Sequence, residues 1–225
     1  MKTPFVSLLV VCAFSSAFAQ SSSEDARLKL SADVLREVMS IKEKAIPQEL
    51  IEKSECAVIV PGMKKGAFIV GAKFGRGFIT CRQDDGTGWK SPAAVRIEGG
   101  SLGFQIGGAE LDVILLVMNK RGAERLLSSK FTMGGEASVA AGPVGRDTSA
   151  QTDGKMTAEI LSYSRQRGVF AGLSLQGASL REDLDSNKAM YGKALTNKQV
   201  LTTNPAAPTA AAELLQELNR YSSHK

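Results

Sequence analysis

The chain has 225 residues, of which 43% are hydrophobic and 23% charged, so it is neither a disordered tail nor a small disulfide scaffold. Its single histidine, His224, precedes the last residue, which argues against a buried His base, a Cys/His nucleophile pair or a His-rich metal site. The formal net charge is only +5, and all 22 glycines lie between Gly62 and Gly192. The two ends of the chain therefore differ in composition from its middle.

The first 19 residues have the pattern of a cleaved secretory signal. Lys2 is the only charged residue there, an apolar run follows over residues 5–14, and Ala17 and Ala19 are small residues that signal peptidase recognises. The run is too short to cross a bilayer as a helix. We therefore expect cleavage after Ala19, secretion across the inner membrane and a periplasmic location.

Two cysteines, Cys56 and Cys81, remain after that cleavage. An oxidising compartment permits a disulfide between them. Cysteine is also common as a buried free thiol. The sequence leaves both alternatives open.

Residues 24–45 are predicted to form an amphipathic helix that begins at a cap of Ser22 and Ser23. Its wide apolar face contains Leu28, Leu35 and Met39. Such a face most often packs on its own domain, but it can also lie on a membrane or a partner. Pro47 begins a second, short helix over residues 48–53.

The middle of the chain predicts short β-strands with glycine at their ends. The predicted strands cover residues 56–60, 66–74, 77–82, 89–97, 101–106, 111–118, 137–141, 157–165 and 168–180. Pro61-Gly62, Gly75-Arg76 and Gly99-Gly100 are predicted to separate them, and residues 84–88 form a hairpin turn. Asn119 is predicted to cap a short helix.

This pattern favours an α+β fold with a β-rich, curved or barrel-like antiparallel sheet and flanking helices, because glycine supplies bulges and corners. Residues 202–208 read as a linker and residues 210–221 as a terminal helix. The predicted organisation is thus a signal peptide over 1–19, one domain over 20–195, and a linker with a C-terminal helix over 196–225.

The charge pattern singles out one basic segment. Between Glu55 and Asp84 there is no acidic residue but there are five basic ones, Lys64, Lys65, Lys73, Arg76 and Arg82. On strand faces and hairpin ends such residues can form a patch for anionic lipid headgroups. Equally, they can form a solvated face that keeps edge strands from pairing.

Catalytic motifs are absent. No Walker, dinucleotide or nucleophile-elbow sequence occurs, and nothing brings the candidate carboxylates Asp112, Asp153 and Glu159 together. Arg165 and Arg167 bracket Gln166 at the end of a polar strand, and they either join two parts of the domain or line a ligand cleft. We expect no enzyme activity, no cofactor and no metal. Nucleic acid is not expected either, because export separates the chain from it and few aromatics can stack bases.

Three stretches of the sequence resemble the SYLF domain family in its bacterial exported branch. They are residues 45–77, 88–119 and 130–180, and the last contains the specific strings GPVGR and YSRQRGVFAGLSLQG. The resemblance implies a lipid-binding or membrane-associated domain without an established reaction. Eukaryotic members bind phosphoinositides, partly through an amphipathic N-terminal segment, and some bind actin.

The chain departs from that family in its neutral N-terminal helix and in Cys56 and Cys81, which stand where the family has small residues. Phosphoinositides and actin are not carried over to an exported protein. The leading expectation is a non-catalytic protein of the cell envelope that binds lipid or an anionic membrane surface. In this hypothesis Lys64, Lys65, Lys73 and Arg76 attract headgroups, while Leu28, Leu35 and Met39 contact acyl chains. The alternative is a structural or protein-interaction module with an envelope partner.

Overall fold

A computed structural model describes residues 11–41, 45–67, 70–102, 107–144, 158–166, 169–170 and 175–222. The helices are α1 (Val11–Ser40), α2 (Gln48–Lys53), α3 (Lys120–Leu126), α5 (Leu184–Tyr191), α6 (Asn197–Thr203), the 3-10 turn η1 (Thr209–Ala211) and α7 (Ala212–Arg220). The strands are β1 (Cys56–Ala67), β2 (Val70–Cys81), β3 (Ala93–Leu102), β4 (Gly107–Val117), β5 (Lys130–Thr132), β6 (Val139–Ala141), β7 (Ile160–Gln166), β8 (Val169–Phe170) and β9 (Ser179–Glu182).

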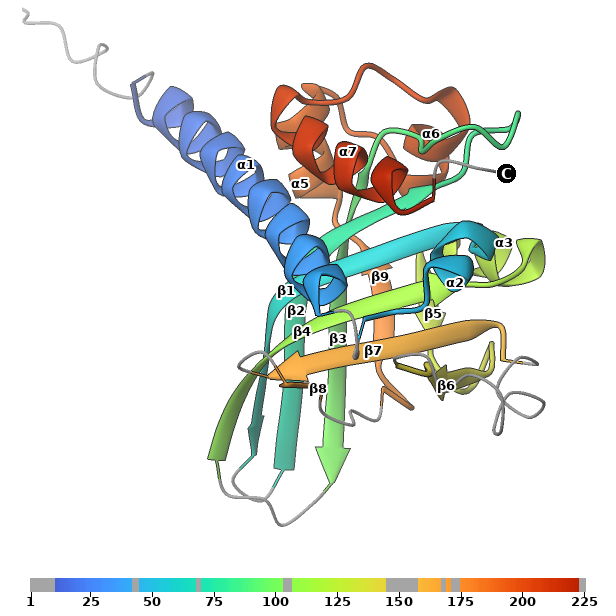
Figure 1. Ribbon diagram of the computed structural model, residues 1–225. Coiled ribbons are helices and arrows are strands. Elements are labelled where there is room, and N and C mark those ends of the chain that lie inside the picture. The colour runs from blue at the N-terminus through green and yellow to red at the C-terminus, as the bar shows by residue number, and fades with distance from the viewer. Residues whose placement is uncertain are drawn as a thin grey trace, which may run out of the picture.

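These strands form one curved, nine-stranded sheet (Figure 1). Their order is β5-β9-β3-β2-β1-β4-β7-β6, with β8 paired to β7. All pairs are antiparallel except β6 and β7, which are parallel. The α+β class and the curved, β-rich sheet with flanking helices are confirmed; the single parallel pair makes the sheet mixed.

Both faces of the sheet are covered, so the molecule has two hydrophobic cores. On one face, α1, α2 and α7 pack over side chains of the central strands, including Ile59, Phe78 and Ile114. On the other face, α3, α6, β5 and β9 pack over the alternate side chains, including Val58, Val95 and Val113. The covered segments of the central strands, such as residues 56–60 and 113–117, are therefore apolar at every position, as expected for strands buried on both sides.

β1 and β2 are each longer than predicted. Pro61-Gly62 does not end β1; the residues form a bulge, seen as a register shift between Ile59 and Lys64 and a φ of +58° at Gly62. Gly75-Arg76 does not divide β2 either. Glycine is needed at Gly77 because a Cβ there would lie 2.0 Å from the carbonyl oxygen of Ile59. These glycines permit close approach of strands rather than ending them.

β3 and β4 differ from the prediction in the same way. Gly99-Gly100 lies inside β3 and pairs with β2, whereas Trp89 precedes the strand and makes only an isolated bridge with Arg82. The local predictions made from capping and turn residues are confirmed: α2 covers Gln48–Lys53, and the side chain of Asn119 caps α3 by accepting from the N–H of Gly122.

α1 begins earlier than predicted and ends earlier as well. The helix continues through Ser22 and Ser23 from Val11, and it ends at Ser40 rather than Ala45. The serines therefore do not cap it, since the preceding apolar run continues the helix. No helix in the described part of the chain is both long and apolar enough to cross a membrane.

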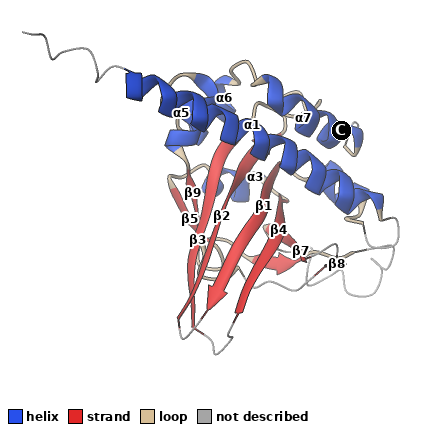
Figure 2. Cartoon of the chain, turned by 90° about the vertical axis from the view of Figure 1, so that its left-hand side faces the viewer, coloured by secondary structure: helices blue, strands red, loops and turns tan. Residues whose placement is uncertain are grey.

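The C-terminal helix α7 packs against α1 (Figure 1). Ala211, Leu214 and Leu218 bury their side chains in the same core as α1. The helices gather around one half of the sheet, and the ends of β1 to β4 extend beyond them (Figure 2). This uncovered end of the sheet carries Lys64 and Lys65 of the basic segment.

Candidate functional site

The apolar face of α1 is part of the domain core. Leu28 and Leu35 are 0% and 1% exposed, and Met39 packs against the same core. Their assignment as acyl-chain contacts is therefore wrong, and the alternative interpretation, docking on the domain, is correct. A wide apolar face was needed because α1 contacts β1 and β2 on one side and α5, η1 and α7 on others.

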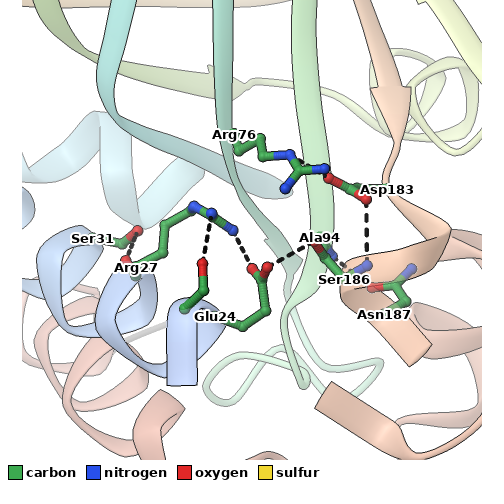
Figure 3. A network of polar contacts seen from close by, with 9 residues as sticks. Glu24, Arg27, Ser31, Arg76, Ala94, Asp183, Ser186 and Asn187 are labelled. Atoms are coloured by element: carbon green, nitrogen blue, oxygen red, sulfur yellow. Dashed lines mark hydrogen bonds and ion pairs between the residues drawn. The ribbon is translucent and has the colours of Figure 1, made fainter. Parts of the chain in front are cut away.

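A buried polar network also fixes α1 to the domain, and Figure 3 shows it close up. Glu24, 1% exposed, pairs with Arg27 and accepts a hydrogen bond of 3.0 Å from the hydroxyl of Ser186. Next to it Arg76 lies 3.0 Å from a carboxylate oxygen of Asp183, at the start of α5. Burial raises the pKa of Glu24, a cost that Arg27 and Ser186 offset in part.

Arg76 and Lys73 do not join Lys64 in one exposed basic patch. Arg76 is committed to the network around Asp183. Lys73 is 7% exposed and lies directly across from Lys65 in the β1–β2 register, on the face opposite to Lys64. Desolvation, together with the charge of Lys65, lowers the pKa of Lys73. Neither residue is therefore an exposed cation beside Lys64 in the manner expected from the charge pattern.

The remaining basic residues meet at an open groove at the end of the sheet that the helices leave bare. Its volume is about 730 Å³, and β1, β4 and β7 supply its walls. The lining residues are Lys64, Lys65, Gly66, Gly108, Ala109, Glu110, Asp112, Arg165 and Gln166. Lys64 is exposed at this groove and Lys65 is half-buried.

Arg165 is the buried cation of the groove, with a side chain that is 8% exposed. Its Nη2 donates to Glu37 of α1 at 2.6 Å and to Asp112 of β4 at 3.0 Å. Burial alone would lower the pKa of Arg165, but the hydrogen bonds that it donates to Asp112 and Glu37 outweigh this effect and raise the pKa. The guanidinium therefore stays charged and joins α1 to the sheet beside the groove.

The β1 bulge orients the acid that faces Arg165. The backbone N–H of Gly62 donates to Oδ1 of Asp112 at 3.0 Å, and Oδ2 of the same carboxylate contacts Arg165. A Cβ at Gly62 would lie 2.7 Å from Oε1 of Glu110, so glycine also makes room for the second acid. Asp112 is thus held from both sides.

An exposed aromatic residue lies beside the groove on the same face. Phe74 is 48% exposed and pairs directly with Lys64 across β1 and β2, so the two side chains are neighbours. In the next row of this face, Gly66 and Ala72 carry little or no side chain. The side chains of Phe74 and Lys64 therefore project beyond their Gly66 and Ala72 neighbours at this end of the sheet.

The structure joins Cys56 and Cys81 in a disulfide, which the sequence left open. The pair lies across β1 and β2 at the end farther from the groove. Arg82, the next residue, donates to the carbonyl groups of Ile51 at 2.9 Å and of Ser222 at 2.9 Å, and its guanidinium lies 4.2 Å from the ring centroid of Trp89. This basic residue is structural, since it ties α2 and the C-terminal segment to the sheet.

The candidate carboxylates do not form a pair. Asp112 is held by Arg165, whereas Glu159 lies 2.9 Å from Arg125; Asp153 lies outside the described residues. The residues that the structure describes contain no group of three His, Cys, Asp or Glu side chains able to hold a metal ion. The groove combines hydrogen-bond donors, from Lys64, Lys65 and Arg165, with the carboxylates of Glu110 and Asp112.

Sequence reasoning found part of this site. Lys64 and Lys65 came from the charge pattern. Arg165 and Arg167, on either side of Gln166, were expected either to join parts of the domain or to line a cleft; Arg165 does both, and Arg167 lies outside the described residues. Glu37 was missed, because it is 128 residues from Arg165 and looks like any polar residue on the outer face of a helix.

Comparisons with known proteins place this fold in a family. Residues 98–221, more than half of the chain, match the Ysc84 family, described as a Las17-binding protein actin regulator. An SH3 domain-containing protein of Schizosaccharomyces pombe is 36% identical over 181 residues, which are 79% of this chain and 41% of that protein.

Two further relatives give the same result. The human SH3 domain-containing YSC84-like protein 1 is 31% identical over 199 residues, 86% of this chain and 58% of the relative. Protein YSC84 of Saccharomyces cerevisiae is 32% identical over 201 residues, 84% and 42% respectively. The chain thus spans about half the length of these relatives. It belongs to the Ysc84 family, the SYLF domain family that its sequence motifs resemble.

Proposed function

We propose that this chain is a non-catalytic binding module of the cell envelope that binds an anionic membrane surface at the uncovered end of its sheet. One observation carries the proposal: exposed Lys64 lies on the open groove and is the direct cross-strand neighbour of exposed Phe74. A cation beside a protruding aromatic residue suits an interface where headgroups are charged and the layer beneath is apolar. Export to the periplasm is part of the proposal, and the Cys56–Cys81 disulfide supports it.

The charges around the groove support weak, salt-sensitive binding. A basic residue close to an anionic surface contributes about 1 kcal/mol, and the attraction fades within about 8 Å at physiological salt. Glu98 and Glu110 lie on the same face as Lys64 and limit the net attraction. Phe74 adds an apolar contact that salt does not weaken. The buried face of α1 has no part in this proposal.

The test is co-flotation of residues 20–225 with vesicles of phosphatidylcholine alone and of phosphatidylcholine with phosphatidylglycerol, at low and high salt. We expect flotation with the anionic vesicles only, reduced by salt, and a loss of at least about fivefold in Lys64→Glu/Lys65→Glu. The matched control is Lys120→Glu/Arg121→Glu. These residues are exposed at the start of α3, so the net charge changes equally and the acids suit a helix N-terminus.

Equal flotation of the two double variants would contradict the groove as the contact surface. A loss of binding shared by both would show that net charge alone is responsible. Phe74→Ser separates the apolar contribution, since it should lower binding at high salt without changing the salt dependence.

A second candidate is a protein-interaction module. The family description names a Las17-binding protein, and the relatives from fission yeast and human are SH3 domain-containing proteins. Absence of flotation with both vesicle types would favour this function over membrane binding.

A further inference from the structure

We propose that Arg165 is the anion-binding residue of the groove and that Glu37 occupies it as an internal competitor. A phosphate group would bind Arg165 by displacing the Glu37 carboxylate. The inference deepens the proposed function, because it concerns the same groove and names the chemistry that the groove recognises.

Arg165 has unused hydrogen-bonding capacity although it is buried. Both carboxylates contact the same nitrogen, Nη2, at 2.6 Å and 3.0 Å. Its Nε is buried and has no hydrogen-bond partner among the described residues. Guanidinium prefers to bind an oxyanion with two parallel N–H donors, and a buried donor without a partner is costly. An oxyanion that contacts two nitrogens of Arg165 would remove that cost.

The two acids on Arg165 differ in how firmly they are held. Asp112 is 24% exposed, lies within β4 and is fixed by the N–H of Gly62. The Glu37 side chain is 63% exposed, and among the described residues Arg165 is the only partner shown for its carboxylate. Its side chain can therefore rotate into solvent at little cost, whereas Asp112 cannot. Glu37 is the carboxylate that a ligand would replace.

The donors beside Arg165 suit a phosphate group as the ligand. Lys65 points to the other face of the sheet, so Lys64 and Arg165 face Glu110, Asp112 and Glu37, and displacing Glu37 removes the excess of negative charge that would repel an anion. Phosphate oxygens suit both the fork of an arginine and the point charges of lysines. Such a group can be part of a lipid headgroup or a free phosphate, and the experiment must distinguish these sources.

The experiment compares Glu37→Gln with wild type and with Asp33→Asn. Asp33 is one turn earlier on α1, is 48% exposed and pairs with Arg36, so the control removes the same charge from the same helix without touching Arg165. Binding is measured by calorimetry with inorganic phosphate at constant ionic strength, and by flotation with the vesicles used above. We expect Glu37→Gln to bind up to about fivefold more tightly, the factor that corresponds to an exposed ion pair of about 1 kcal/mol.

Arg165→Lys supplies the opposite change. It keeps the charge but loses the fork, so phosphate affinity should fall below that of wild type while the chain stays folded, as judged by its melting temperature. A gain in Glu37→Gln with phosphate and vesicles alike, or with vesicles alone, assigns the site to a headgroup. A gain with phosphate alone assigns it to a soluble phosphate.

Unchanged affinity of Glu37→Gln in both arms would overturn the competitor role, and so would an equal gain in Asp33→Asn. The experiment distinguishes a wrong competitor role for Glu37 from a wrong membrane-binding proposal. If wild type floats in a manner that depends on Lys64 and Lys65 and Glu37→Gln changes nothing, only this inference falls. If no vesicle binds but Glu37→Gln gains affinity for phosphate, the membrane proposal falls and the anion site stands.

Discussion

Glu24 shows at the scale of one residue how the protein accommodates a buried charge. The carboxylate lies between Arg27 of its own helix and Ser186 of α5, so α1 is held at a fixed position over the sheet. Burial nevertheless favours the protonated form, and the folded-state pKa is raised above the ordinary value. The residue therefore orients α1 at some cost in stability when it is ionised.

This shift predicts a pH-dependent difference between wild type and Glu24→Gln. Because folding raises the pKa, the folded state binds more protons, and wild type loses stability as pH rises above the unfolded value of about 4.5. The neutral amide of the variant avoids that loss. The free energy of unfolding of wild type minus that of Glu24→Gln should therefore decrease from pH 4 to pH 7, measured by urea denaturation.

Glu49→Gln is the control, since it removes a carboxylate that is 56% exposed on α2. If the free energy of unfolding of wild type minus that of Glu24→Gln increases with pH, the ion pair with Arg27 outweighs the burial of Glu24.

At the scale of elements, the close contact of β1 and β2 depends on one glycine. A Cβ at Gly77 would lie 2.0 Å from the carbonyl oxygen of Ile59 and 2.7 Å from the Cα of Val60, and neither backbone atom can move without separating the strands. Gly66, in the same pair of strands, has nothing within 4 Å of its Cβ position. The two positions therefore form a matched pair for mutagenesis.

We expect Gly77→Ala to lower the free energy of unfolding by about 3 kcal/mol or more, or to prevent folding. Gly66→Ala should change it by less than about 0.5 kcal/mol. Denaturant unfolding of both variants and of wild type measures these changes in the free energy of unfolding. Equal stability of the two variants would mean that β1 and β2 adjust around an added methyl group, contrary to the packing described.

Elements with local sequence signals could be predicted, whereas strand ends that depend on a neighbouring strand could not. α2 and α3 were predicted because their signals, Pro47 and Asn119, act within one helical turn. The strand ends were misplaced because Pro61-Gly62, Gly75-Arg76 and Gly99-Gly100 look locally like turns, while their actual role depends on the neighbouring strand. Contacts between distant segments are not encoded in local patterns.

For the whole molecule, the disulfide and the first 19 residues together predict export to the periplasm. Expressed in full in a bacterial host, the chain should be recovered from the periplasm beginning at Gln20, since Ala17 and Ala19 suit signal peptidase. Cys56 and Cys81 should resist alkylation until reduced. Intact-mass analysis measures both properties.

The control is a chain that starts with Met followed by Gln20, which should remain in the cytoplasm with both thiols free to react. Recovery of the full-length chain from the cytoplasm, with reactive cysteines, would contradict export.

The site itself could be predicted only in part. Lys64 and Lys65 are adjacent in sequence and stood out by charge, but Arg165 is brought to Asp112 and Glu37 across 53 and 128 residues. The burial of Lys73 and the pairing of Arg76 with Asp183 likewise depend on which face of the sheet is covered. Charge along the chain therefore identified candidates, and the topology selected among them.

The disulfide has a further consequence for how the molecule withstands damage. It closes residues 56–81 into a covalent loop that contains β1, β2, Lys64 and Lys65. A protease that cuts once inside this loop leaves both fragments attached, with their sheet partners β3 and β4 still in place. The groove can therefore outlast a single cut, and the fragments part only when the bond is reduced and the chain unfolds.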